Sequence, residues 1–334
     1  MLFLCVCAFA LCGLAATRPT LEATSDPICD KSQDEYYDWG AVTTIPKSRA
    51  TPTPEPVAPA PGSSSTSTFV FKKYAAVGDS FTAGPGPYQS FGDDLNCERT
   101  VASYPKQFFD RYGKDKPADN FRLLACHGHN CNEILHQIQS PEFGNPDLVS
   151  ITLGGNEEGS SDGSFGHGIF HNVVASCVVA SEIGCDHYLE EAGKVISGIG
   201  PTLDEVIKAA VTTNPPPAPL KRTVVVLGYP LIYTADTSKE HSCPGRHWYT
   251  NDLDLDEEGI AINNLISRMN DQLKASAEKN GARYVDVDFG EHRVCEPVPW
   301  FQTKNDGNTG EVMMHPTVEG YSHMADAMAR ALGL

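Results

Sequence analysis

Apolar runs of strand length alternate with amphipathic helical patterns from Phe69 onward. The runs lie at 69–78, 121–126, 147–155, 223–230 and 282–288. Helical patterns lie at about 103–112, 130–139, 168–181, 201–212, 259–280 and 317–332. The pattern at 259–280 is the clearest, because Ile262, Leu265, Ile266, Met269 and Leu273 recur at helical spacing. This alternation predicts an α/β fold, with a parallel sheet covered by helices on both faces.

The first 68 residues follow neither pattern. An apolar stretch at 2–16 ends in small residues, which predicts a signal peptide (1–16) cleaved after Ala15 or Ala16, although no basic residue precedes it. A buried N-terminal helix is the alternative. Residues 17–68 are rich in Pro, Ser and Thr, which predicts a disordered linker before a single folded domain at 69–334. The chain is therefore expected to be secreted and extracellular.

Charge and hydropathy narrow the possible partners. The chain has 25 basic and 43 acidic residues, and its net charge of −18 would repel the phosphates of nucleic acids. A membrane helix needs about 18 consecutive apolar residues, and no later run approaches that length, so stable membrane insertion is not expected. We expect a monomer without a metal or another cofactor.

Cysteine usage agrees with export. Removal of the leader leaves eight of the 11 cysteines, and an even number in an exported chain favours disulfides. None of the eight falls in a C-x-x-C pair, which disfavours structural zinc. His167 and His171 have a helical metal-ligand spacing, but no HExxH motif accompanies them, and local polarity is the simpler interpretation.

Candidate chemistry lies where the apolar runs end. In an open α/β sheet, ligands bind beyond the carboxyl ends of the strands. The first run ends in Gly-Asp-Ser, with Ser80 in a tight turn, although such turns are common without any catalytic role. After the next two runs, Gly128 and Asn156 offer hydrogen-bond donors that an oxyanion would need, together with the Ser80 amide. His315 stands in a late loop before a proline, where its imidazole could act as general base.

These four segments, in this order, resemble the sequence blocks of the SGNH (GDSL) hydrolase superfamily over about 69–334. The resemblance implies a flavodoxin-like, three-layer α/β/α sandwich and hydrolysis of carboxylic esters through an acyl-enzyme. It assigns Ser80 and His315 as catalytic residues, and Ser80, Gly128 and Asn156 as the oxyanion hole. The secreted microbial lipase and esterase branch is the most similar.

That branch carries three disulfides, and the resemblance implies the pairs Cys97–Cys126, Cys177–Cys185 and Cys243–Cys295. A fourth pair, Cys29–Cys131, stays open.

Two positions depart from the family pattern. Val312 stands where an acid often orients the histidine, so we expect a Ser80–His315 dyad completed by a backbone carbonyl, with Glu311 as the alternative orienting acid. Glu157 replaces the usual Asp after Asn156, and we expect it to support the loop.

The main prediction is therefore a secreted serine esterase or lipase. The alternatives are a carbohydrate acetyl-esterase of the same fold and, because of Val312 and Glu157, a secreted binding protein that has lost catalysis.

Overall fold

The computed structural model describes the chain from residue 69 to its end, with internal gaps. The described residues are 69–93, 95–113, 115–158, 168–174, 177, 185–234, 255–294, 296–302 and 314–334. They belong to one compact unit, Ser65–Leu334. The expected signal peptide and almost all of the expected linker lie outside the described residues.

Five parallel strands form one sheet in the order β2-β1-β3-β4-β5. The strands are β1 (Tyr74–Gly78), β2 (Phe121–Leu123), β3 (Leu148–Thr152), β4 (Thr223–Leu227) and β5 (Arg283–Val285). All residues of β1 and β3 are buried, as the continuous apolar runs predict for central strands covered on both faces.

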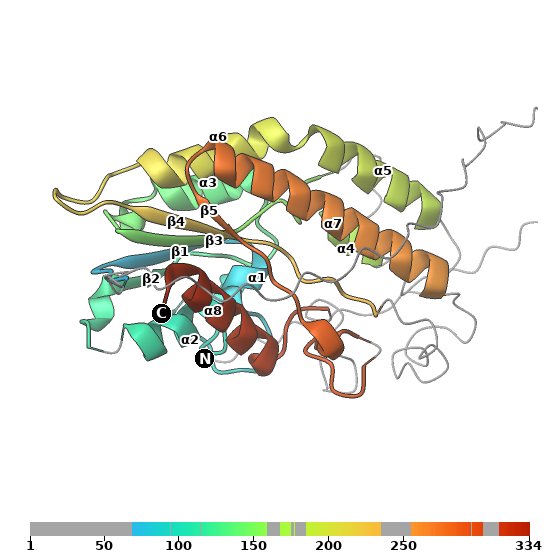
Figure 1. Cartoon of the computed structure of the whole chain (residues 1–334), viewed down its shortest axis with the longest axis horizontal. Helices are drawn as coiled ribbons and strands as arrows, with labels where there is room; N and C mark the ends of the chain where they lie inside the picture. Colours follow the sequence, from blue (N-terminus) through green and yellow to red (C-terminus); the bar gives the residue numbers. More distant parts are fainter. Residues whose placement is uncertain are drawn as a thin grey trace, which may run out of the picture. The chain divides into compact units, whose positions relative to one another are not determined.

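Helices cover both faces of this sheet (Figure 1). Helices α2 (Tyr104–Tyr112) and α8 (Val318–Leu332) pack together on one face. The other face carries α3 (Cys131–Gln139), α5 (Cys185–Gly198), α6 (Gly200–Thr212) and α7 (Leu255–Lys279). The short helices α1 (Ser80–Ala83) and α4 (Ile169–Val174) follow β1 and β3. The predicted three-layer α/β/α fold with a flavodoxin-like parallel sheet is confirmed.

Strand β1 and helix α5 are among the elements that differ from the sequence prediction. The run at 69–78 forms a strand only from Tyr74, because the amides of Lys72 and Lys73 donate to the Asp147 carboxylate and not to a neighbouring strand. Helix α5 has no counterpart among the predicted helices, although its buried residues Ala192 and Ile196 lie four positions apart on one helix face.

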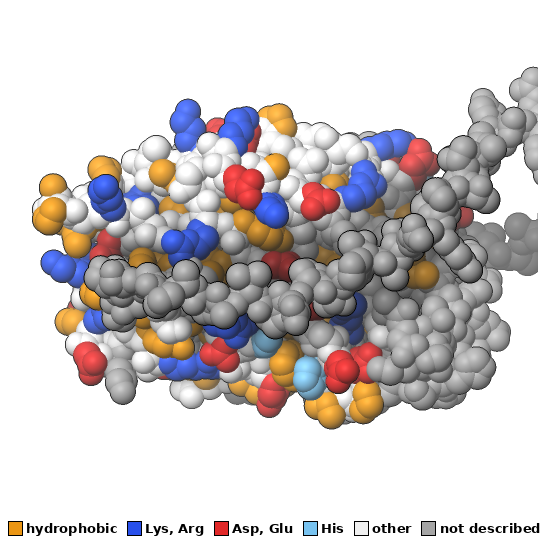
Figure 2. Space-filling model, in the orientation of Figure 1, with side chains coloured by type: hydrophobic (Ala, Val, Ile, Leu, Met, Phe, Trp, Pro, Cys, Tyr) orange, Lys and Arg blue, Asp and Glu red, His pale blue; other side chains and the backbone are white. Residues whose placement is uncertain are grey.

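One face of the described part of the chain mixes both signs of charge. Figure 2 shows basic and acidic side chains interspersed over one face, with hydrophobic side chains scattered between them. None of the helices in the described part of the chain combines the length and apolar character needed to cross a bilayer.

Candidate active site

Ser80 lies in a tight turn at the carboxyl end of the central strand β1. Gly78 adopts φ +136°, and a Cβ there would lie 2.5 Å from the Thr152 carbonyl oxygen, so the turn requires glycine on both counts. Asp79 caps α1 by accepting a hydrogen bond from the Phe81 amide at 3.0 Å. Ser80 is therefore the first residue of a helix and is 5% exposed.

The Asp79 carboxyl anchors this turn to the ends of β3 and β4. It accepts a hydrogen bond from Thr152 Oγ1 at 2.6 Å and another from the Tyr229 hydroxyl. Burial raises the pKa of the Asp79 carboxyl, whereas the hydrogen bonds from Thr152, Tyr229 and Phe81 act in the opposite direction. These contacts assign Asp79 to holding the turn that carries Ser80.

His315 lies against Ser80, with 2.7 Å between His315 Nε2 and Ser80 Oγ. The carbonyl oxygen of His315 accepts a hydrogen bond from the Gln302 amide at 2.7 Å, which fixes the histidine backbone. The imidazole ring contacts Phe81, with ring centroids 5.3 Å apart. A neutral histidine whose Nε2 lone pair faces a serine hydroxyl can take up its proton.

Gly128 and Asn156 belong to loops that hydrogen bonds hold together beside this pair. Asn156 Nδ2 donates to the carbonyl oxygen of His129 at 3.2 Å. Gln137 of α3 bonds both backbone groups of Gly78 and approaches His129 Nδ1 at 2.9 Å. Gly128 has φ +78°, and a Cβ added there would meet no atom within 4 Å, so its backbone conformation and not lack of space favours glycine.

Glu157 supports the structure around this loop, as predicted. Its Oε1 accepts a hydrogen bond from the Cys131 amide at 2.6 Å, at the start of α3. An acid at a helix N-terminus interacts favourably with the free amides and the helix dipole. Glu311, the alternative acid for His315, and Val312 lie outside the described residues.

Two of the expected disulfides are present, Cys97–Cys126 and Cys177–Cys185. Cys243 and Cys295 lie outside the described residues. Cys131 is a free, fully buried thiol, and Cys29, the partner considered for it, also lies outside that part of the chain.

One cluster among the described residues has the spacing of a metal site, with ligand atoms of Cys97, Cys126 and His129 within 4.8 Å of one another. Both sulfurs are joined in a disulfide, so the cluster offers no thiolate. Of the two histidines with helical spacing, His171 lies in α4, and His167 falls outside the described residues.

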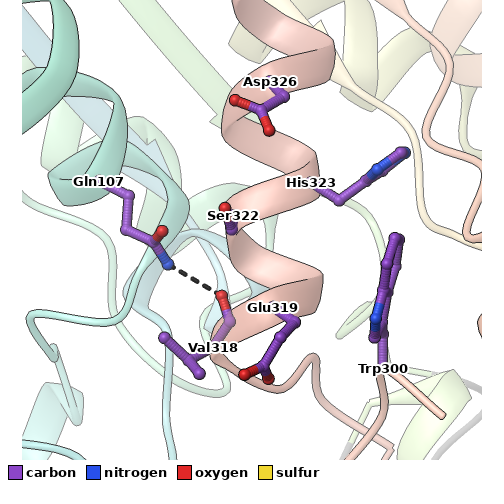
Figure 3. Close-up of a pocket in the computed structure, with 7 residues that line it drawn as sticks. All are labelled: Gln107, Trp300, Val318, Glu319, Ser322, His323 and Asp326. Atoms are coloured by element: carbon purple, nitrogen blue, oxygen red, sulfur yellow. Dashed lines mark hydrogen bonds between the residues drawn. The ribbon is translucent and has the colours of Figure 1, made fainter. Parts of the chain in front are cut away.

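A groove of about 380 Å³ lies alongside the first turns of α8 (Figure 3). Its lining residues are Gln107, Trp300, Val318, Glu319, Ser322, His323 and Asp326. Trp300 stacks on His292 with centroids 3.8 Å apart, and its carbonyl oxygen accepts from the Thr317 amide. Arg111 of α2 donates to both Ser322 and Asp326, so the polar wall between α2 and α8 serves to join these helices.

Two residues beside Ser80 and His315, Glu98 and His127, were not among the predicted site residues. His127 packs against His315, with ring centroids 5.2 Å apart, and its Nδ1 lies 2.7 Å from Glu98 Oε2. His127 could have been identified from the sequence, because it directly precedes Gly128. Nothing in the local sequence marks Glu98.

Known proteins resemble this chain in sequence. The GDSL-like Lipase/Acylhydrolase family matches residues 76–323. Lipase 1 of Streptomyces coelicolor is 27% identical over 251 residues, which are 75% of this chain and 82% of that protein. A lipase of Streptomyces rimosus is 27% identical over 252 residues, with the same coverage of 75% and 82%.

Two solved structures of Streptomyces enzymes resemble this chain in fold. The extracellular lipase from Streptomyces rimosus superimposes with a TM-score of 0.59 at 26% identity, covering 78% of this chain and 99% of that one. Phospholipase A1 from Streptomyces albidoflavus superimposes with a TM-score of 0.60 at 25% identity, and the match covers 78% of this chain and 98% of that one. Both matches extend over nearly the whole of the bacterial chains.

Proposed function

This chain belongs to the GDSL-like lipase/acylhydrolase family, and from that premise we propose that Ser80 is its nucleophile and His315 its general base. The protein is a carboxylic ester hydrolase. The observation that carries the assignment is the 2.7 Å contact between Ser80 Oγ and His315 Nε2 at the carboxyl end of β1.

The reaction proceeds through an acyl-enzyme. Ser80 Oγ attacks the ester carbonyl carbon while its proton passes to His315 Nε2. The amides of Ser80 and Gly128 and the side chain of Asn156 stabilise the oxyanion. His315 then protonates the departing alcohol, and a water molecule activated by the same imidazole hydrolyses the acyl-Ser80 ester. These steps use side chains and backbone amides of the protein alone.

His315 is proposed to work in a dyad, with a backbone carbonyl and not Glu311 orienting its ring. Replacing Glu311 by Gln is therefore expected to change the kcat for a p-nitrophenyl ester by less than about threefold. Steady-state kinetics of the purified variant measure this. A loss of about a thousandfold or more, toward the scale of about 10⁴-fold seen when an orienting acid is removed from a serine triad, would establish Glu311 as the acid.

The proposed substrates are acyl esters of lipids. The relatives that carry this proposal are named lipases and a phospholipase A1, and the region matched by the family, 76–323, includes both Ser80 and His315. We expect the kcat/KM for p-nitrophenyl esters to rise from acetate toward longer acyl chains, because a lipid-binding cleft gains binding energy with each buried methylene. Acetylated xylan serves as the competing substrate, and hydrolysis confined to acetyl groups would favour the carbohydrate acetyl-esterase.

The proposal extends to the organisation and location of the protein. A signal peptide (1–16) and a linker (17–68) would precede a catalytic domain at 69–334 that works outside the cell as a monomer. The support is the extracellular lipase among the similar structures, together with the disulfides of the described domain. The intact mass and the hydrodynamic size of protein recovered from culture medium test these boundaries and the oligomeric state.

A further inference from the structure

A second imidazole stands beside the proposed general base. The rings of His127 and His315 meet edge to face, with an interplanar angle of 65°. His127 directly precedes Gly128, whose amide belongs to the proposed oxyanion hole. It is therefore close to the reacting groups, although the ester-hydrolysis steps assign it no role.

The structure fixes the orientation of this second imidazole. Glu98 Oε2 lies 2.7 Å from His127 Nδ1, and a carboxylate only accepts hydrogen bonds, so Nδ1 carries the proton. The His127 amide donates to the carbonyl oxygen of Cys97 at 3.2 Å. The disulfide Cys97–Cys126 joins the two residues that immediately precede Glu98 and His127. One covalent bond and two hydrogen bonds thus hold the pair in place.

The charge of this pair suits the reaction. When His127 is neutral, the Glu98–His127 unit carries one negative charge next to a ring that must become positive when it takes the Ser80 proton. The alternative, an imidazolium at His127, would place two like charges side by side in the transition state. The buried carboxyl of Asp79 is a further acidic group in electrostatic contact with His127.

We propose that Glu98 and His127 form a positioning pair, in which His127 packs against the His315 ring and the negative charge of Glu98 stabilises the protonated form of that ring, while the proposed backbone carbonyl orients it. This inference rests on the proposed function of His315. It assigns a role to a carboxylate that lies far from His315 in the sequence and acts through another side chain.

The test is a double-mutant cycle on the full chain with a p-nitrophenyl ester. Glu98→Gln keeps the shape of the side chain and removes its charge, and His127→Phe keeps a ring against His315 without the bond to Glu98. Each change is expected to lower kcat about tenfold with KM within about twofold, the scale of one unit charge lost at a partly exposed position close to the reacting groups. The double variant is expected to be no slower than the slower single variant, because both changes break the same unit.

The matched control is Glu205→Gln, which removes the same charge from an exposed position on α6 and is expected to leave kcat unchanged. If His127→Phe does not fold, His127→Gln replaces it in the cycle. Losses that multiply in the double variant, a change in KM alone, or unchanged kcat in the single variants would each overturn the positioning pair. An unaltered protein without esterase activity would instead contradict the proposed function.

Discussion

Ser80→Ala is expected to lower kcat for ester hydrolysis by about 10⁴-fold or more, the scale of loss when the nucleophile of a serine hydrolase is removed. The reason is chemical: without Oγ no acyl-enzyme can form, and the remaining donors stabilise only a direct attack by water. The fold should tolerate the change, because Ser80 occupies a helix N-terminus and alanine is a good helix former.

Fluorophosphonate labelling gives an independent measurement of the same group. The unaltered protein is expected to take one label, and Ser80→Ala is expected to take none. Ser197→Ala is the matched control, since this serine lies on α5 and its hydroxyl bonds the Gly193 carbonyl oxygen and the Arg268 guanidinium, with no histidine at hydrogen-bond distance among the described contacts. Absence of label on the unaltered protein would instead support the noncatalytic binding protein.

The second large effect is expected for His315→Ala, with kcat again about 10⁴-fold lower and KM little changed. Alanine removes the imidazole that lies at hydrogen-bond distance from Ser80 Oγ. Because the proposed nucleophile and the proposed base would act as one unit, the variant lacking both should be about as slow as Ser80→Ala alone.

Labelling of His315→Ala by the fluorophosphonate should also slow greatly, because the serine then has no base to take its proton. His187→Ala, an exposed histidine on α5, serves as the comparison and should retain the kinetics of the unaltered protein. A His315→Ala variant with near-normal kcat would move the general base to another residue, and His127 would be the first to examine.

Much of this arrangement could be predicted because it depends on local sequence. Apolar runs that end in turn residues predicted that Ser80, Gly128 and Asn156 follow the carboxyl ends of strands. In the structure they follow β1, β2 and β3. The candidate role of His315 could be predicted only from the order of the four sequence blocks, since a single His-Pro pair carries little information.

Other features depend on contacts between distant positions, and local periodicity does not report them. Glu98 and His127 are 29 residues apart, and Tyr229 reaches Asp79 across 150 residues. Strand length is a similar case, because Asp147 takes the amides that would otherwise extend β1. In each case the two residues come into contact only when the chain has folded.

The disulfide Cys97–Cys126 has a consequence for when the enzyme becomes active. Strand β2 has only three residues and lies at the edge of the sheet, and the loop that leaves it toward His127 and Gly128 forms backbone hydrogen bonds to Gly78 and Cys97. The disulfide adds a covalent constraint to this loop, and thiols pair stably in an oxidising compartment. A chain whose Cys97 and Cys126 are still reduced is therefore expected to hydrolyse esters more slowly than the disulfide-bonded protein, because the segment before Gly128 is then less constrained.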